Sequence, residues 1–345
     1  MNIPMHFNHV STRTTSQVVS LLYGALFGFA PFLGAQEPAS TLPTLPVIPE
    51  PPTLAVMGHD GWFFLPSEIR HLATVANVSP PTGENDPLPA ILDFQQSLAR
   101  KGIRLVILPV PEKSLIRADQ LFPASEVAAA AGYAKASGRF IDALRAKGVD
   151  VMDTRLLLTT AAAHAEEGRD PVYCKTDSHF TPHTTAMLAR AIASHIHEIQ
   201  PDMVRQIGAG PIAGPECKIT IHGDLVPPET IEKIAFHGVT KATGAAMPDP
   251  ASPVLLLGDS HCLVFHAGGD MLAKDGGLAD NLGVELGCFP DIIAVRGSGA
   301  TAARVNLYRK VHKDPGFLAN KKIVLWCFAA REFTQSDGWK IVPLP

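Results

Sequence analysis

Short apolar runs alternate along the chain with longer stretches of helical character. The strand-like runs are residues 105–109 (LVILP), 149–152 (VDVM), 254–257 (VLLL), 292–295 (IIAV) and 323–326 (IVLW). Helices are predicted at about 124–147, which is rich in alanine, and at 182–199. Short strands with few polar positions are typical of a parallel sheet that helices cover on both faces. The pattern therefore predicts an α/β fold of three layers with a largely parallel central sheet.

The first 35 residues have the layout of an export signal. Residues 18–33 contain no charged group, and Arg13 lies upstream, as in a positive segment followed by an apolar one. The apolar run is shorter than the roughly 20 residues that a membrane-spanning helix needs, and it contains Pro31. Residues 1–35 are therefore predicted to be a cleaved signal peptide, with an uncleaved membrane anchor or a buried core helix as the alternatives. The protein is therefore expected to be exported.

Residues 36–53 are predicted to be a linker. The stretch 36–52 holds six prolines, which remove amide donors and stiffen the chain toward polyproline II. The sequence shows no internal repeat and no second linker. The folded domain is therefore expected to span residues 54–345 as a single unit, a length that one core can serve.

Composition narrows the classes of function. The 345 residues are 46% hydrophobic and 18% charged, which excludes general disorder. The formal net charge is -4 and there is no basic stripe, so nucleic-acid binding is not expected. The five cysteines form no C-x-x-C pair, which argues against a structural zinc site and a dense disulfide framework. At most two disulfides can form, and no cysteine is expected to be catalytic.

The strongest local signal for chemistry is Gly258-Asp259-Ser260, at the carboxyl end of the run 254–257. In an open α/β sheet, ligands bind beyond the carboxyl ends of the strands, which makes Ser260 a candidate nucleophile. A serine needs a base to take its proton, and the base needs an orienting carboxylate. The alternative is a strand-to-helix turn in which Asp259 or Ser260 caps the next helix. The second glycine of G-x-S-x-G is missing, which disfavours an α/β-hydrolase nucleophile elbow.

The base is predicted in the loop before the second helical stretch. Pro182 fits the first turn of that helix with Thr181 as its N-cap, and Asp177 and His179 stand just ahead of them. Asp177 can accept the Nδ1 proton of His179, which leaves Nε2 free to face Ser260.

This loop has two other interpretations. Asp177 can be a capping residue beside a surface histidine, or His179 and His183 can form part of a metal site. No carboxylate stands at H-E-x-x-H spacing, so no metal is expected.

A third candidate site, for substrate binding or an oxyanion, is Arg296-Gly297-Ser298, which follows the run 292–295. Glycine lets the backbone approach a ligand closely, and amides at the following helix start can hold an anion or a developing oxyanion. Arg296 can add a positive donor. A plain glycine-rich turn is the alternative, and no phosphate-binding or dinucleotide fingerprint is present. Because both follow parallel strands, the loops at Gly258 and Arg296 are expected to face each other at the carboxyl edge of the sheet.

A series of short motifs occurs along nearly all of the chain after the linker. They are residues 58–64 (GHDGWFF), 108–113 (LPVPEK), 119–123 (DQLFP), 176–182 (TDSHFTP), 222–225 (HGDL), 257–260 (LGDS), 296–299 (RGSG), 322–326 (KIVLW) and 331–332 (RE). This series resembles the alginate O-acetyltransferase family of the AlgX and AlgJ type, with its G-K-D-G-W-L-F entry and its D-T-H-W-T-P loop. The resemblance implies an SGNH hydrolase-like domain with its motif blocks permuted in sequence.

The chain departs from the family pattern at Phe180, Ser178 and Thr184, where the family has Trp, Thr and usually Gly. None of these changes removes a reacting group. The asparagine of an SGNH oxyanion block is not identifiable, which leaves the Ser260 amide as the expected oxyanion donor beside residues 296–298. The short stretch after residue 332 leads us to expect no separate carbohydrate-binding domain.

The resemblance implies an acyltransferase with a triad of Ser260, His179 and Asp177, which passes an acetyl group from the serine to a hydroxyl of an exopolysaccharide in the periplasm. It implies no cofactor. The implied partners are the polysaccharide acceptor and a membrane-bound acetyl donor protein, with inner-membrane association through the N-terminal segment. The alternatives are a carbohydrate acetyl esterase, in which water replaces the sugar hydroxyl, and a non-catalytic polysaccharide-binding component of an export or modification complex.

Overall fold

The computed structural model describes residues 42–48, 55–77, 85–164, 171–202, 210–241, 244–245, 248–297, 299–336 and 338–345. The chain divides into two units, Met1–Ala39 and Ser40–Pro345, and every element below belongs to the second. The expected signal segment and the loop residue Ser298 lie outside the described residues. Among the helices that the structure describes, none is long and apolar enough to cross a membrane.

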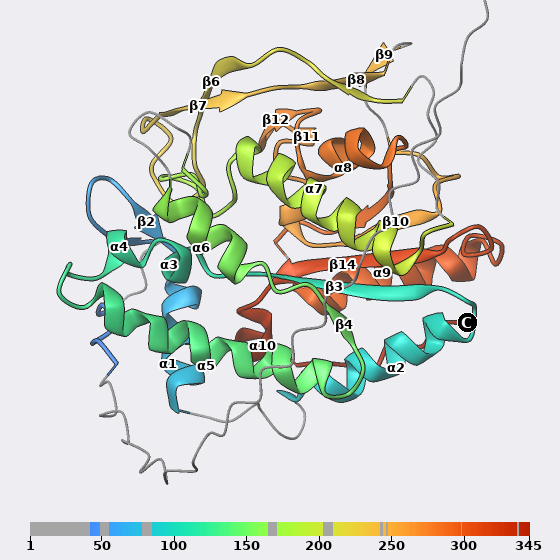
Figure 1. Cartoon of the computed structure of the whole chain (residues 1–345), viewed down its shortest axis with the longest axis horizontal. Helices are drawn as coiled ribbons and strands as arrows, with labels where there is room; N and C mark the ends of the chain where they lie inside the picture. Colours follow the sequence, from blue (N-terminus) through green and yellow to red (C-terminus); the bar gives the residue numbers. More distant parts are fainter. Residues whose placement is uncertain are drawn as a thin grey trace, which may run out of the picture. The chain divides into compact units, whose positions relative to one another are not determined.

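A five-stranded sheet forms the centre of the second unit (Figure 1). In spatial order its strands are β13 (Asp291–Ala294), β10 (Val254–Gly258), β14 (Ile323–Ala329), β3 (Arg104–Val110) and β4 (Asp150–Val151). All neighbouring strands pair in parallel. These strands are the five apolar runs of the sequence, and the predicted parallel sheet is confirmed.

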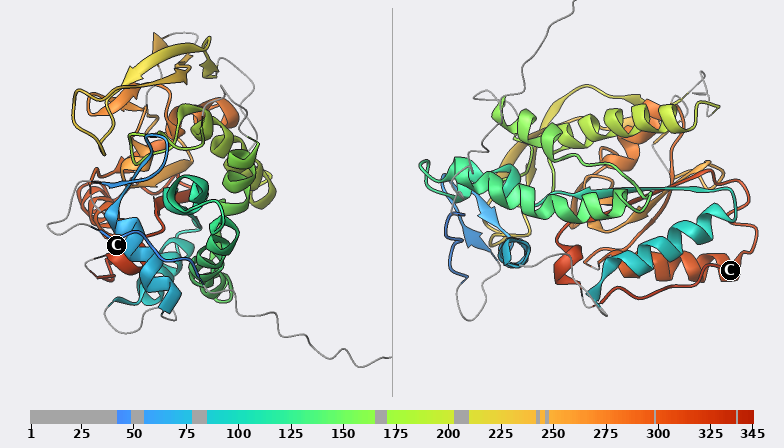
Figure 2. Two further views of the ribbon diagram at one scale, coloured as in Figure 1. Left: turned by 90° about the vertical axis from the view of Figure 1, so that its left-hand side faces the viewer. Right: turned by 60° about the horizontal axis from the view of Figure 1, so that its bottom comes forward.

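Helices cover both faces of this sheet. The larger ones are α1 (Pro66–Asn77), α2 (Pro87–Ala99), α5 (Val127–Arg145), α7 (Pro182–Ile199), α8 (Leu278–Leu286) and α9 (Ala300–Lys313). Val254 and Leu256 of β10 join the core cluster that includes α7 and α8, whereas Leu255 and Leu257 join the cluster that includes α2 and α9. Figure 2 shows α2 and α9 side by side on one face of the sheet. The inner strands β10, β14 and β3 are thus buried on both sides, which explains their apolar runs, whereas the edge strands β13 and β4 are partly buried.

Shorter elements complete the unit. They are β1 (Val56–Met57), β2 (Phe63–Phe64), α3 (Lys113–Ile116), α4 (Ala118–Leu121), α6 (Arg155–Ala163), β5 (Ile212–Ala213), β6 (Cys217–Ile221), β7 (Glu232–Phe236), β8 (Val239–Lys241), β9 (Gly244–Ala245), η2 (Ser260–Cys262), β11 (Ala267–Gly268), β12 (Met271–Lys274) and α10 (Glu332–Gln335). Strands β6 and β7 form an antiparallel hairpin, and so do β11 and β12.

Part of the expected linker packs on the folded unit. Leu42, Leu45 and Ile48 contact the main hydrophobic core. The hydroxyl of Tyr133, on α5, donates a hydrogen bond of 2.7 Å to the carbonyl oxygen of Pro43. Residues 42–48 therefore differ from a free spacer, because their apolar side chains and one carbonyl group have partners in the domain.

Candidate active site

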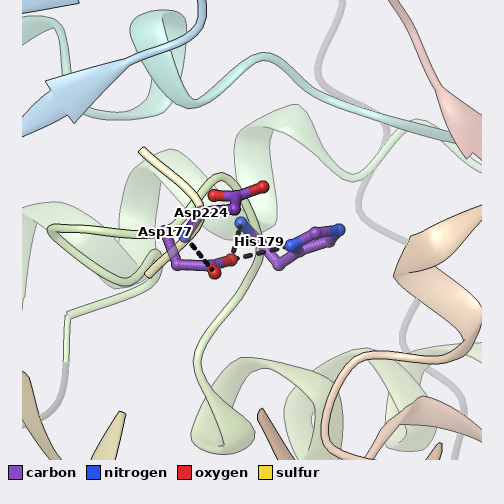
Figure 3. A group of neighbouring side chains, drawn as sticks. All are labelled: Asp177, His179 and Asp224. Atoms are coloured by element: carbon purple, nitrogen blue, oxygen red, sulfur yellow. Dashed lines mark hydrogen bonds and ion pairs between the residues drawn. The ribbon is translucent and has the colours of Figure 1, made fainter. Parts of the chain in front are cut away.

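Ser260, His179 and Asp177 lie together beyond the carboxyl ends of the sheet strands. The Nδ1 atom of His179 is 2.7 Å from Oδ1 of Asp177, and its Nε2 atom is 2.7 Å from Oγ of Ser260. Both Asp177 and His179 are buried, and Figure 3 shows the carboxylate turned toward the imidazole ring. This series of hydrogen bonds is the arrangement that activates a serine hydroxyl as a nucleophile.

The end of β10 sets the position of Ser260. Gly258 packs so closely on β14 that an added Cβ would come within 2.0 Å of a carbonyl oxygen of that strand. Asp259 accepts hydrogen bonds of 2.9 Å from the amide of His261 and from an amide of β14. Asp259 therefore caps the short helix η2 while the Ser260 hydroxyl reaches His179. Capping by Asp259 and the contact of Ser260 with His179 occur in the same turn.

The loop of residues 175–179 is held at its start by a carboxylate of β7. Glu232 accepts the amide of Lys175 through Oε1 at 2.9 Å. Its Oε2 atom accepts the amide of Thr176 at 2.9 Å and the hydroxyl of Thr176 at 2.8 Å. Bonds to an ionised acceptor are among the stronger hydrogen bonds, so this end of the loop is fixed to the hairpin.

Asp224 holds the other end of the same loop. Its carboxylate accepts the amide and the hydroxyl of Ser178, both at 2.7 Å, and its own amide donates to Oδ2 of Asp177 at 3.0 Å. Gly223 lies against Thr176, where an added Cβ would come within 2.0 Å of the carbonyl oxygen. The sequence signals Asp224 only through the motif 222–225, and it gives no signal for Glu232.

Helix α7 begins where the sequence predicts. Thr181 is the N-cap, its hydroxyl oxygen accepts the amide of Thr184 at 3.4 Å, and Pro182 occupies the first turn. The capped helix start fixes the chain two residues after His179, so the imidazole is held from both sides along the backbone.

Pairing sets the protonation of Asp177 and His179. Burial favours a raised pKa for the Asp177 carboxyl, but the hydrogen bonds and the charge of His179 outweigh burial and hold that pKa below its usual 3.8. Burial favours a lowered pKa for His179, but Asp177 outweighs it and raises the pKa of the imidazole above its usual 6.5. Asp177 is therefore ionised at neutral pH and favours the imidazolium that forms when His179 takes a proton.

A second Asp-x-His pair stands beside the first. The ring centre of His261 is 4.8 Å from that of His179, and Nδ1 of His261 is 3.1 Å from Oδ1 of Asp259. Burial lowers the pKa of His261, although Asp259 opposes the shift. His261 is thus a neutral imidazole that pairs with Asp259. The other neighbouring histidine, His183, is exposed on α7.

A cavity of about 570 Å³ opens over these residues. Its wall includes Ser260 and His179, together with Thr220 of β6, Met271 of β12 and Arg331. One strand of each antiparallel hairpin thus contributes to this wall. A concave site with a few convergent polar groups is typical of a ligand-binding pocket.

The loop at Arg296 reaches the same cavity, because β13 and β10 are parallel neighbours. Arg296 and Gly297 line the wall, and Arg296 forms an ion pair with Asp270. The start of α9 differs from the expectation that its amides hold an anionic substrate or an oxyanion. The amide of Ala300 lies 3.3 Å from Oε2 of Glu332, so a carboxylate of the chain itself occupies the position that favours an anion.

Cys262 is the cysteine nearest to the candidate nucleophile in sequence. It is fully buried, and its thiol forms a hydrogen bond with Cys327. All five cysteines carry free thiols in this structure. The thiol of Cys262 therefore faces the core beside β14.

Asp177, His179 and Asp224 are close enough to share a metal ion, with ligand atoms within 4.8 Å of one another (Figure 3). Asp177 already accepts the amide and Nδ1 of His179 and the amide of Asp224. Asp224 already accepts two groups of Ser178. The geometry favours a hydrogen-bonded network over an ion shared by these three residues, because an ion would displace these bonds.

Comparison with known proteins assigns the family. The family described as SGNH hydrolase-like domain, acetyltransferase AlgX, has a model that matches residues 55–262, more than half of the chain. The chain belongs to this family. The alginate biosynthesis protein AlgX of Pseudomonas putida is 27% identical over 150 residues, which are 43% of this chain and 29% of that protein. The chain thus matches less than a third of the length of this AlgX relative.

Two solved structures share the fold. The O-acetyltransferase domain of Pseudomonas putida AlgJ matches with a TM-score of 0.59 at 20% identity, over 82% of this chain and 93% of that one. Pseudomonas aeruginosa AlgX matches with a TM-score of 0.58 at 18% identity, over 83% of this chain and 65% of that one. The predicted family of the AlgX and AlgJ type and its SGNH hydrolase-like α/β fold are confirmed, and the roles of the individual site residues stay predictions.

Proposed function

We propose that the chain is an O-acetyltransferase that moves an acetyl group through an acyl-serine intermediate to hydroxyls of an exopolysaccharide of the alginate type. The observation that carries this proposal is the pair of 2.7 Å contacts that joins Asp177 to His179 and His179 to the Ser260 hydroxyl, in the wall of a cavity. Membership of a family described as an acetyltransferase supports the same reaction.

In the first half-reaction, Oγ of Ser260 attacks the carbonyl carbon of the acetyl donor. The Oγ proton moves to Nε2 of His179, and Asp177 stays ionised and stabilises the imidazolium. The bond between the acetyl carbon and the donor then breaks, and His179 returns the proton to the leaving group. The amide of Ser260 is the proposed donor to the developing oxyanion, with Arg296 and Gly297 at the same cavity wall.

In the second half-reaction, a sugar hydroxyl attacks the acetyl-serine carbonyl. His179 takes the hydroxyl proton, the sugar oxygen forms the new ester bond, and the proton passes to Oγ as Ser260 is released. The chain's own groups balance both steps without a cofactor. Water in place of the sugar hydroxyl gives acetate instead, so transfer depends on how well the occupied cavity excludes water.

The proposal includes a place in the cell. We infer that residues 1–35 export the protein to the periplasm, that residues 36–53 link this segment to the domain, and that the domain runs to residue 345. The charge-free run 18–33 supports export. Acetyl-CoA is a cytoplasmic metabolite, so the donor is then a membrane-bound acetyl carrier protein.

The test follows the acetyl group. The purified protein is incubated with a chromogenic acetyl ester, with and without alginate oligosaccharides, and the acetyl content of Ser260 and of the glycan is measured by mass spectrometry. Acetyl on Ser260 and then on the glycan is the expected result. Release as acetate alone, even with glycan present, would indicate the esterase. Absence of ester turnover together with glycan binding would overturn the enzyme in favour of a binding component.

A further inference from the structure

Lys113 is a fully buried lysine in contact with the loop that carries the catalytic pair. It is 1% exposed and begins α3, at the end of the motif 108–113. Its Nζ atom donates hydrogen bonds of 2.9 Å to the carbonyl oxygen of Lys175 and 3.0 Å to that of Asp177. The two acceptors are the first and third residues of the loop 175–179, so one ammonium group joins two carbonyl groups of the loop.

The surroundings are unfavourable for a charge. Nζ of Lys113 lies 5.3 Å from the ring centre of Trp62 and 5.4 Å from that of Phe64. Within the described residues, its hydrogen bonds go to carbonyl oxygens and not to a carboxylate. Burial of an ammonium group without an ionic partner costs free energy, which aromatic faces and two carbonyl groups offset only in part.

The titratable groups that face Lys113 are Cys174, Glu68, Asp177 and Glu232. Burial lowers the pKa of Lys113 to about 8, against the opposing effect of these four groups. The side chain is therefore mainly protonated at neutral pH. Charge-assisted hydrogen bonds are about twice as strong as neutral ones, so the ammonium holds its two carbonyl acceptors firmly.

We propose that Lys113 is a positioning residue for the active site: its two hydrogen bonds fix the main chain of Asp177 so that the carboxylate meets Nδ1 of His179. The inference rests on the proposed function of these residues. The same Asp177 oxygen accepts both the amide and Nδ1 of His179, so a shift of the Asp177 main chain disturbs both bonds. A displacement of about 1 Å at a reacting group can lower a rate by about 100-fold.

The test begins with Lys113→Met, which keeps most of the side-chain volume and removes the donors. The expected result is a kcat on a chromogenic acetyl ester that falls about 10-fold to 100-fold. KM should stay within about twofold, because Lys113 is not part of the cavity wall. The downfield proton resonance of His179 Nδ1 should broaden or move upfield. Lys113→Arg, which keeps the charge and the donors, should recover most of the lost kcat.

Lys321 provides a matched control. It is also 1% exposed, and its Nζ atom donates to the carbonyl oxygens of Pro250 and Ser252, at 2.8 Å and 2.9 Å. It also pairs with Asp291 at 2.9 Å, and all these groups lie at the amino ends of the strands, opposite the active site. Lys321→Met should lower stability at least as much as Lys113→Met, while kcat and the His179 resonance of the folded protein stay unchanged.

Each outcome decides the proposal. A lowered kcat together with a broadened or shifted His179 resonance, in Lys113→Met but not in Lys321→Met, supports it. An unchanged kcat and resonance in folded Lys113→Met, or an equal loss in both variants, overturns it. If Lys113→Met does not fold, Lys113→Gln is judged by the same criteria, because the glutamine side chain is one bond shorter than that of lysine and does not reach the two carbonyl oxygens. If neither variant folds, Lys113 is a purely structural residue and the proposal is overturned. Failure of the proposed function has a different result: the wild-type protein shows no ester turnover. The positioning role of Lys113 can still be tested in that case, because the His179 resonance is measured without substrate.

Discussion

The two Asp-x-His pairs of the site share a local geometry and differ in what they reach. In both pairs, Oδ1 of the aspartate forms hydrogen bonds with the main-chain amide and with Nδ1 of the histidine two residues later. His179 extends this series to the Ser260 hydroxyl, whereas His261 packs beside it. The reach of Nε2 to the hydroxyl therefore supports His179 over His261 as the proposed base, which the Asp-x-His spacing alone does not do.

Removal of any member of the proposed triad should abolish most of the turnover. Ser260→Ala, His179→Ala and Asp177→Asn are each expected to lower kcat on an acetyl ester on the order of 10³-fold, because the three groups act as a unit. Circular dichroism checks that each variant is folded. His261→Ala and His183→Ala are the controls and should stay active. Full turnover in folded Ser260→Ala and His179→Ala would contradict the mechanism.

The pH dependence should follow His179. Its pKa is raised above 6.5 by Asp177, and the base must be neutral to take the serine proton, so kcat/KM should rise with pH through a midpoint above 6.5. Asp177→Asn removes the charge that favours the imidazolium, so its residual activity should rise at lower pH than that of the wild type. A pH profile of ester turnover measures both midpoints. The same midpoint in both proteins would show that Asp177 does not set this pKa.

The three residues of the proposed triad could be picked out from the sequence because their signals are local, and the structure brings them together. Asp177 and His179 precede a Thr-Pro helix start, and Ser260 follows an apolar strand. The contacts that hold the loop give no such local signal. Glu232 bonds to amides 56 and 57 positions earlier, and Lys113 donates to carbonyl groups 62 and 64 positions later. Such pairs arise only from the tertiary fold.

At the scale of elements, strands that are buried on both faces could be predicted and exposed ones could not. Each strand of the central sheet follows from an apolar run, because α7 and α8 cover one face and α2 and α9 the other. Strand β6 is largely exposed, and its five residues alternate between apolar and polar, which is a strand signal of a different kind from the continuous apolar runs that located the central sheet. The two antiparallel hairpins were therefore absent from the predicted architecture.

Gly258 is the position where β10, β14 and the serine turn meet. An added Cβ would come within 2.0 Å of the carbonyl oxygen of Cys327 and 2.7 Å of the thiol of Cys262. Gly258→Ala is therefore expected to lower the free energy of unfolding by about 1–3 kcal/mol, as overpacking of a core does. It should also lower kcat, because the turn must move Ser260 away from His179. Urea denaturation and ester turnover measure the two effects.

Gly102 provides the control for that substitution. Its φ of +72° strains any side chain, and no atom lies within 4 Å of an added Cβ. Gly102→Ala should thus cost about 1–2 kcal/mol of stability through the backbone alone. Turnover per folded molecule should not change, since Gly102 precedes the amino end of β3. If Gly102→Ala lowered kcat as much as Gly258→Ala, general destabilisation would explain both losses.

At the scale of the whole unit, parallel pairing assembles the site from distant segments. Strands β10 and β13 are neighbours, so the loops after them, at Gly258 and Arg296, open into one cavity. The sequence predicts this juxtaposition because the carboxyl ends of parallel strands share an edge. The family match ends at residue 262, so the Arg296 loop lies beyond it and its proposed part in binding rests on the cavity geometry.

The amino-terminal boundary of the folded unit can be measured by truncation. A chain that begins at Ser40 keeps the segment 42–48, and a chain that begins at Leu54 lacks it. The shorter chain is expected to be less stable by about 1–3 kcal/mol, because the apolar side chains of the segment cover the core at roughly 1 kcal/mol each and the entropy of ordering the segment offsets part of this. Urea denaturation measures the difference.

Tyr133→Phe should cost about 1 kcal/mol in the longer chain and nothing in the shorter one, since the Tyr133 hydroxyl bonds to Pro43. Equal stability of the two chains, with an equal effect of Tyr133→Phe in both, would mean that the segment is a spacer that adds nothing to the fold.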